Sequence, residues 1–212
     1  MADLTLLHTA QVHVDRFATL VPGAQLQQIV RPDWLARAQN GIDDTLRRDI
    51  TETIGALQGP VLCSCTTIGE VAETAGATRI DWPMMQEAAR IGGPILMTYC
   101  LNSTLEPSCA LLRRAFHEIG HPPDLHPFDL AALWPLFEAG ETAAFAKAIS
   151  TALLTELSKR PDIAAVVLAQ ASMAGAAELL KDKTDVPILS SPQIALRTLL
   201  PKDLCPPAAK GT

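Results

Sequence analysis

Short apolar runs alternate with longer stretches of helical spacing along most of the chain. Mostly apolar short runs predict strands, and segments in which apolar residues recur every three or four positions predict helices. The predicted strands are 4–8, 27–30, 60–64, 94–98, 124–128, 164–169 and 186–189. The predicted helices are 42–57, 66–75, 82–91, 105–119, 141–158, 172–180 and 192–200. Strands that alternate with helices indicate an α/β fold with parallel sheets flanked by helices.

Two segments about half the chain apart resemble each other. VLCSCTTIGEVAE, residues 61–73, aligns with VVLAQASMAGAAE, residues 166–178, when Cys65 is set against Gln170. Each segment is an apolar run, a small polar turn and the start of a helix, and such a repeat predicts two similar units. We therefore expect two pseudo-symmetric lobes with the active site in the cleft between them. The first lobe is predicted to be residues 1–93 plus 191–212, and the second lobe residues 94–190.

A second similarity lies at the ends of two predicted strands. LLHT, which ends at Thr9, resembles ILMT, which ends at Thr98. In open α/β sheets, ligands bind at the carboxyl ends of the strands. We therefore expect one cleft, faced by Thr9, Cys65, Thr98 and Gln170.

Cys65 stands where a predicted strand passes into a predicted helix. Unpaired N–H groups and the positive end of the helix dipole stabilise a thiolate at such a position, so we expect a lowered pKa and a role as base or nucleophile. The same N–H groups, with the hydroxyls of Thr66 and Thr67, suit a carboxylate or a developing enolate. The alternative interpretation is an ordinary buried core cysteine. Cys63 alternates with Cys65 along the strand and is expected to point elsewhere.

Charge and composition narrow the range of partners for this chain of 212 residues. A net charge of -6 argues against nucleic acid, which leaves a small molecule. The chain has no apolar run of membrane-spanning length and no basic signal-like start, so we expect no membrane contact and a cytoplasmic location. Five cysteines suit free thiols in a reducing compartment. No zinc-like spacing and no glycine-rich phosphate motif occur, so we expect neither a metal nor a cofactor.

Three stretches together resemble the aspartate/glutamate/hydantoin racemase superfamily: Cys65-Thr66-Thr67, the repeated segment around Gln170, and ILMTYCLNSTLEPSCALLRR, residues 95–114. The resemblance follows nearly the whole chain in order and length. It implies two α/β lobes around a small carboxylate substrate, and two cysteines, one from each lobe, that exchange a proton at the α-carbon without a cofactor. Cys65 matches the first cysteine, and Gln170 occupies the place of the second.

The resemblance also implies a set of substrate-binding residues. They are Thr9, Thr66, Thr67, Thr98, Thr104, Ala171 and Ser172. It is compatible with a homo-oligomer. No aromatic cluster stands near the proposed turns along the chain, so the sequence gives no sign of an aryl substrate.

Gln170 departs from the pattern of the superfamily. Two-base racemisation needs a proton donor and a proton acceptor on opposite faces of the substrate, and a glutamine amide does not titrate in the usable range. His8, next to Thr9, is the candidate for the missing acid because histidine titrates near neutrality. A hydrogen-bonded histidine at a strand end is the other interpretation.

We therefore expect a cofactor-independent isomerase of the racemase/epimerase type that acts through a Cys65 thiolate, with a strict two-base mechanism in doubt. Two further hypotheses remain open. One is a single-cysteine isomerase or decarboxylase, as the resemblance to maleate isomerases and arylmalonate decarboxylases of the same superfamily implies. The other is a catalytically silent carboxylate-binding protein.

Overall fold

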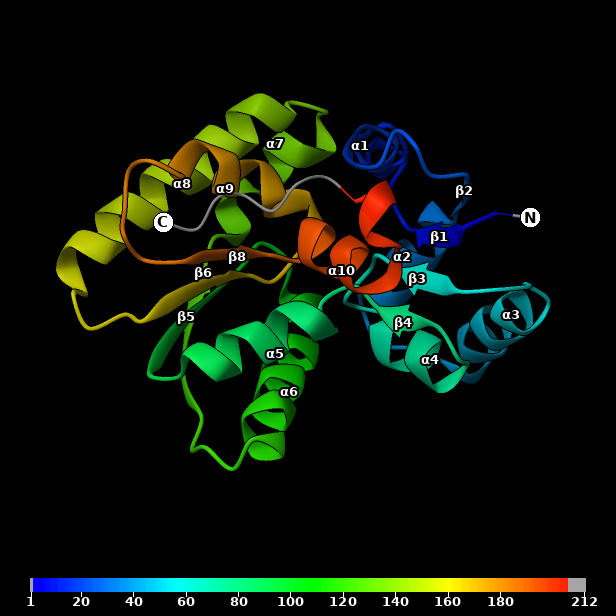
Figure 1. Cartoon of the computed structure of the whole chain (residues 1–212), viewed down its shortest axis with the longest axis horizontal. Helices are drawn as coiled ribbons and strands as arrows, with labels where there is room; N and C mark the ends of the chain where they lie inside the picture. Colours follow the sequence, from blue (N-terminus) through cyan, green and yellow to red (C-terminus); the bar gives the residue numbers. More distant parts are fainter. Residues whose placement is uncertain (1, 206–212) are drawn as a thin grey trace.

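The protein is built from two parallel β-sheets, each with helices on both faces (Figure 1). It is described by a computed structural model that covers residues 2–205. Within that range the strand order is β2-β1-β3-β4 in the first sheet and β6-β5-β7-β8 in the second, and every pairing is parallel. The two orders are equivalent, so the internal repeat corresponds to two sheets of one topology. The predicted α/β fold with two pseudo-symmetric lobes is confirmed.

The strands follow the apolar runs closely. The first sheet consists of β1 (Leu4–His8), β2 (Leu26–Val30), β3 (Val61–Cys63) and β4 (Thr78–Arg79). The second consists of β5 (Pro94–Tyr99), β6 (Asp124–Asp129), β7 (Ala165–Leu168) and β8 (Ile188–Ser190). Each of the seven predicted strands overlaps an observed one. Strand β4 was not predicted because two residues are too few to show a pattern.

The helices were predicted less completely. They are α1 (Val12–Leu20), α2 (Pro32–Ala38), α3 (Asp44–Gly55), α4 (Gly69–Thr74), α5 (Trp82–Ile91), α6 (Asn102–Glu118), α7 (Trp134–Glu138), α8 (Thr142–Lys159), α9 (Gly175–Leu180) and α10 (Ser191–Leu199). Helices α1, α2 and α7 were missed. The helix predicted to begin at residue 66 begins at Gly69, which leaves the residues after Cys65 in a turn. Likewise, a short 3₁₀ helix, Ala171–Ala174, precedes α9.

Alternate residues of the strands face opposite sides of each sheet, and both sides are buried. On the first sheet, Leu7 and Cys63 pack under α2, α3 and α4, while Leu6 and Leu62 pack under α1 and α10. The second sheet is covered by α5 and α6 on one face and by α8 and α9 on the other. Burial on both faces explains why the inner strands β1, β3, β5 and β7 are mostly apolar, whereas the edge strands β2 and β6 are more exposed and more polar.

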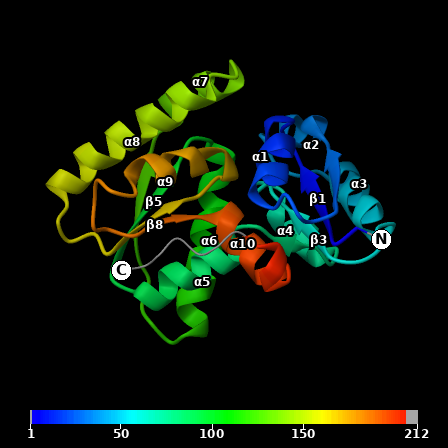
Figure 2. The same cartoon turned by 45° about the horizontal axis from the view of Figure 1, so that its top comes forward.

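Helix α10 lies between the lobes (Figure 2). Its Ala195 and Leu196 belong to the core of the first sheet, whereas Ile194 belongs to the core under α5 and α6. The boundaries predicted for the lobes stay a prediction, and residue 1 and residues 206–212 lie outside the described range. In the part of the chain that the structure describes, no helix has both the length and the apolar character required to cross a bilayer.

A buried ion pair joins β4 to the start of α5. The Nε and Nη2 atoms of Arg79 donate to the two carboxylate oxygens of Asp81, each over 3.1 Å. The side chains are 5% and 1% exposed. Gly69 makes room for the guanidinium, because a Cβ at Gly69 would lie 2.9 Å from Arg79 Nε. The paired charges satisfy each other inside the protein, and removing one partner leaves an uncompensated buried charge.

Asp81→Ala is expected to lower the free energy of unfolding by about 3–5 kcal/mol, because it leaves Arg79 buried without a counter-charge. Urea denaturation measures the loss. The control is Asp162→Ala, which breaks an ion pair with the same Arg-x-Asp spacing on the surface. There Arg160 and Asp162 are 30% and 49% exposed. Equal losses in the two variants would contradict this account of the pair.

Candidate functional site

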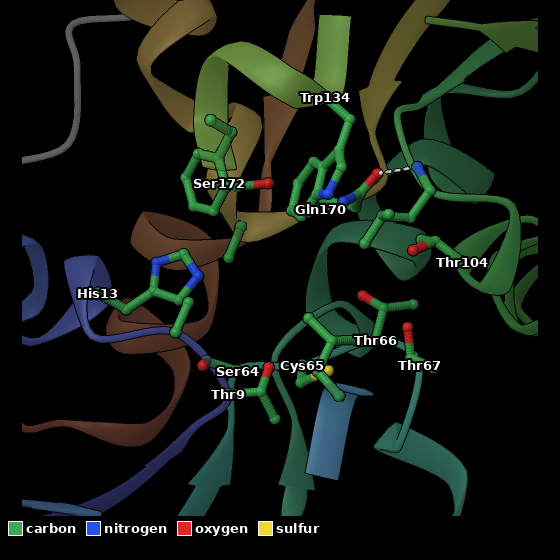
Figure 3. Close-up of a pocket in the computed structure, with 15 residues that line it drawn as sticks. Thr9, His13, Ser64, Cys65, Thr66, Thr67, Thr104, Trp134, Gln170 and Ser172 are labelled. Carbon is green, nitrogen blue, oxygen red and sulfur yellow. Dashed lines mark hydrogen bonds between the residues drawn. The ribbon is translucent and has the colours of Figure 1, made fainter. Parts of the chain in front are cut away.

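The main candidate site is a small pocket where the carboxyl ends of the two sheets meet. Its cavity volume is about 40 Å³. Turns after β1, β3 and β7 and the first turn of α6 supply most of its wall. The lining residues include Thr9, His13, Ser64, Cys65, Thr66, Thr67, Thr104, Trp134, Gln170, Ala171 and Ser172. Thr9, Cys65, Thr66 and Thr67 lie on one side of this space, and Trp134, Gln170 and Ser172 on the other (Figure 3).

Cys65 lies in the turn after β3, and its side chain is almost fully buried, with 8% of its surface exposed. Burial raises the pKa of its thiol, although the hydroxyl of Thr9, the backbone N–H groups of Ile68 and Thr67 and the hydroxyl of Thr67 donate toward the sulfur and lower it in part. The predicted fall in pKa is therefore wrong. The helix begins four positions after Cys65, so desolvation outweighs the donors at the helix start.

The two threonines after Cys65 are already engaged within the protein. Thr66 Oγ1 donates to the backbone oxygen of Ala169 over 3.1 Å and so joins the two lobes. Thr67 Oγ1 lies 3.3 Å from the hydroxyl of Ser103 in α6. Both residues line the pocket, yet the Thr66 hydroxyl serves as a bridge between the lobes.

Gln170 occupies the equivalent turn after β7. Its side-chain oxygen accepts hydrogen bonds from the backbone N–H groups of Cys100, over 2.6 Å, and Leu101, over 3.0 Å. The side chain is 8% exposed. Cys65 and Gln170 therefore line one pocket from the two lobes, and only Cys65 of the two carries an ionisable group.

Thr98 and His8 do not line this pocket. Thr98 is fully buried at the end of β5, and its hydroxyl has no partner among the described residues. His8 is also fully buried, with Nδ1 2.8 Å from Ser64 Oγ and Nε2 2.9 Å from Gln28 Oε1. Gln28 donates its amide N–H to the oxygen of Val14, so its oxygen faces His8.

Two hydrogen bonds hold the ring of His8. Nε2 donates to Gln28 Oε1, and Nδ1 lies 2.8 Å from Ser64 Oγ, a hydroxyl that also lies 3.3 Å from the backbone oxygen of Leu7. Burial lowers the pKa of His8, and the hydrogen bond to Gln28 raises it in part. His8, the proposed alternative acid, is therefore a buried, hydrogen-bonded histidine at the end of a strand, and it does not line the pocket.

An aromatic wall was missed in the sequence. His13 in α1 and Phe137 in α7 line the pocket with their rings 6.2 Å apart, and Trp134 stacks on Phe137 at 4.8 Å. Burial, and then repulsion by His8 and Arg16, lowers the pKa of His13 to about 3. These residues come from helices that the apolar pattern did not reveal. The aromatic residues are far from the turns along the chain, but the fold brings them to the pocket.

The lining of the pocket carries no Asp, Glu, Lys or Arg among the described residues. Its titratable side chains are Cys65 and His13, and His13 is neutral near pH 7 because of its lowered pKa. Residues 2–205 also contain no group of three or more His, Cys, Asp and Glu side chains arranged to hold a metal ion. The site therefore offers hydroxyls, amides, one thiol and aromatic rings.

No protein-family model and no curated protein sequence matches the chain. Solved structures do. Glutamate racemase from Francisella tularensis has a TM-score of 0.63 at 13% identity, over 92% of this chain and 78% of that one. Aspartate racemase from Picrophilus torridus has a TM-score of 0.63 at 12% identity, over 95% and 96%.

Allantoin racemase from Klebsiella pneumoniae is also similar, with a TM-score of 0.60 at 16% identity over 99% of this chain and 95% of that one. At such low identities these likenesses concern the fold alone. The fold that the resemblance to the aspartate/glutamate/hydantoin racemase superfamily implies is thereby supported, and the replacement of the second cysteine by Gln170 stays a prediction.

The buried histidine of the pocket predicts a loss of stability in acid. Below its ordinary pKa of 6.5, His13 binds a proton in the unfolded chain but not in the folded protein, where its pKa is about 3. The free energy of unfolding should therefore fall as the pH drops below 6.5, by at most about 1.4 kcal/mol per pH unit from this residue. Urea denaturation of the protein and of His13→Phe between pH 7 and pH 4 measures both slopes. If the free energy of unfolding falls equally with pH in the two proteins, the lowered pKa of His13 is contradicted.

Proposed function

We propose that this protein is a cofactor-independent enzyme of the racemase superfamily that transfers a proton to one face of the α-carbon of a small carboxylate, as a single-cysteine isomerase or decarboxylase, with Cys65 as its one proton-transfer group. The observation that carries the proposal is the pairing of Cys65 with Gln170 across one pocket. The likeness of the fold to glutamate, aspartate and allantoin racemases supports chemistry at a carbon next to a carbonyl group.

The state of Cys65 favours proton donation. Burial raises the pKa of its thiol, so the group is protonated near neutral pH. A protonated thiol can deliver its proton to an enediolate carbon on one face. With a malonate-type substrate, the bond between the α-carbon and one carboxylate breaks, carbon dioxide leaves, and the electron pair forms the enediolate. The S–H proton then bonds to the α-carbon, and solvent restores the thiol.

Among the described lining residues, the wall opposite Cys65 supplies no second proton carrier. Gln170 does not titrate, His8 lies outside the pocket lining, and His13 is neutral with a pKa of about 3. Proton transfer on one face therefore explains the residues better than strict two-base racemisation.

The absence of charged side chains from the described lining bears on the substrate. An amino acid would bring an ammonium group into a buried pocket with no carboxylate to pair with it, which is costly. A carboxylate without an ammonium group, such as a substituted malonate, fits the lining better. Hydroxyl, amide and indole donors can hold its oxygens.

A catalytically silent carboxylate-binding protein is the second candidate. The observation in its favour is that burial raises the pKa of Cys65, so no resting thiolate is present near neutral pH. Such a protein would bind a carboxylate without converting it and would tolerate replacement of the thiol.

Cys65→Ser separates the two candidates. The enzyme hypothesis predicts that this variant lowers turnover by a factor of roughly 100 to 10,000, because a hydroxyl does not replace the thiol as general acid. Proton NMR in deuterium oxide, with a panel of substituted malonates, hydantoins, maleate and amino acids, measures α-deuteration, decarboxylation and isomerisation together.

The matched control is Cys205→Ser, since Cys205 is half-buried and its sulfur lies near the backbone oxygen of Leu196, away from the pocket. That variant should keep the activity of the unaltered protein. If no member of the panel is converted, or if Cys65→Ser converts substrate at the original rate, the proposed enzyme function is wrong.

Gln170→Cys should add a proton carrier on the second face. If Cys65 alone delivers the proton, this variant should form both enantiomers of a chiral product, whereas Gln170→Ser should not, since it truncates the side chain equally but adds no thiol. Chiral chromatography of the product measures the ratio. A single enantiomer from Gln170→Cys would contradict the assigned places of the two residues.

A further inference from the structure

A second cavity lies along the outer edge of the second sheet. Its volume is about 540 Å³, within the roughly 300–1,000 Å³ that is usual for ligand pockets. Strand β8, the last strand of that sheet, supplies one wall, and α9 and α10 supply most of the rest. Strand β8 itself lies between α9 and α5 (Figure 1). The described lining of this cavity shares no residue with the pocket around Cys65.

The outer edge of β8 offers backbone groups for pairing. Val166 of β7 lies opposite Ile188, and its N–H donates to the oxygen of Pro187 over 2.9 Å. In a parallel pair of this register, the residue opposite turns its own N–H and C=O away from the neighbouring strand. Ile188 therefore presents one donor and one acceptor at an edge that no other described strand covers. Such an edge suits the backbone of an extended peptide.

Charged side chains of both signs surround this cavity. Its cations are Lys181 and Arg197, and Glu87 and Asp185 supply carboxylates. None of these four side chains forms an ion pair with another described residue. Glu178, a further carboxylate of the lining, already accepts a hydrogen bond from α10 over 2.8 Å. Unpaired charges of both signs around one space suit a ligand that carries an ammonium group and a carboxylate.

The rest of the lining combines apolar surface with one buried hydroxyl. Leu180, Val186 and Ile194 supply the apolar surface. Ser190, at the end of β8, is 5% exposed, and its Oγ has no hydrogen-bond partner among the described residues. Buried polar groups are usually hydrogen-bonded, so an unpaired hydroxyl in a cavity wall indicates a place for a polar group of a ligand. Apolar side chains joined by peptide units match this lining.

We propose that this cavity binds a short apolar peptide with free termini, which adds as a strand along the outer edge of β8. Its backbone pairs with Ile188, and its side chains lie against the apolar surface. Its carboxylate terminus pairs with the cations of the lining and its ammonium terminus with the carboxylates. A free amino acid carries both charges but lacks the peptide units that pair with a strand edge. A peptide with blocked termini has those units but lacks the charges.

A titration followed by nitrogen-15 NMR, with the tripeptide Ala-Leu-Ala as the probe, tests the site. The tripeptide should shift the backbone N–H resonances of Ile188 and Ser190. N-acetyl-Ala-Leu-Ala-amide keeps the peptide units without the charges, and free leucine keeps the charges without the peptide units. Each should bind at least about fivefold more weakly than Ala-Leu-Ala. Added salt should reduce the advantage over the blocked peptide, because most of the charged side chains are exposed.

Lys181→Gln combined with Arg197→Gln should weaken Ala-Leu-Ala about threefold and leave the blocked peptide nearly unchanged, because it removes the partners of the carboxylate terminus. The matched control is Lys147→Gln combined with Arg48→Gln, which changes the net charge equally at two exposed residues outside the lining. The site is overturned if Ala-Leu-Ala does not bind, if the blocked peptide or leucine binds as tightly, or if both double variants weaken binding equally. Cys65→Ser should bind the tripeptide normally, so loss of the proposed enzyme function leaves this site intact.

Discussion

The two hydrogen bonds that the Gln170 oxygen accepts from Cys100 and Leu101 organise the second lobe at the pocket. They satisfy two backbone N–H groups immediately before α6, which begins at Asn102. They also turn the amide NH₂ toward the site. One residue earlier, the oxygen of Ala169 accepts the hydroxyl of Thr66 from the first lobe. The turn after β7 therefore joins the two lobes and places an amide group, rather than an ionisable side chain, across the pocket from Cys65.

Burial has the second large effect on this site. The pocket is small and uncharged in its described lining, and desolvation raises the pKa of Cys65 while it lowers the pKa of His13 and of His8. All three groups are therefore neutral near pH 7. A neutral thiol opposite a neutral amide is suited to giving one proton to an anionic intermediate, and neutral donors around it stabilise the oxygens that carry the charge.

Much of the fold could be predicted because the burial of a strand is visible in its own short stretch of sequence. Strands buried on both faces are apolar runs, and the repeat of residues 61–73 in 166–178 corresponds to β3 and β7, which hold equivalent places in their sheets. The pairing of Cys65 with Gln170 followed from that equivalence. Helices α1 and α7 were not predicted, and their places beside the pocket depend on packing between distant parts of the chain.

The parts of the site that were missed depend on those helices. His13 and Trp134 reach the pocket only because α1 and α7 pack near each other across the lobes. The lowered pKa expected for Cys65 was wrong because burial is a property of the assembled fold, which the spacing of residues does not report. Thr98 and His8 stand at strand ends as expected, but their side chains are enclosed by the protein.

The most direct measurement is the stereochemical course of the reaction. A prochiral disubstituted malonate is incubated with the unaltered protein in deuterium oxide, and the enantiomers of the α-deuterated product are separated by chiral chromatography. Delivery of the proton by Cys65 from one face predicts a single enantiomer. A racemic product formed by the protein would contradict one-sided proton transfer between Cys65 and the substrate.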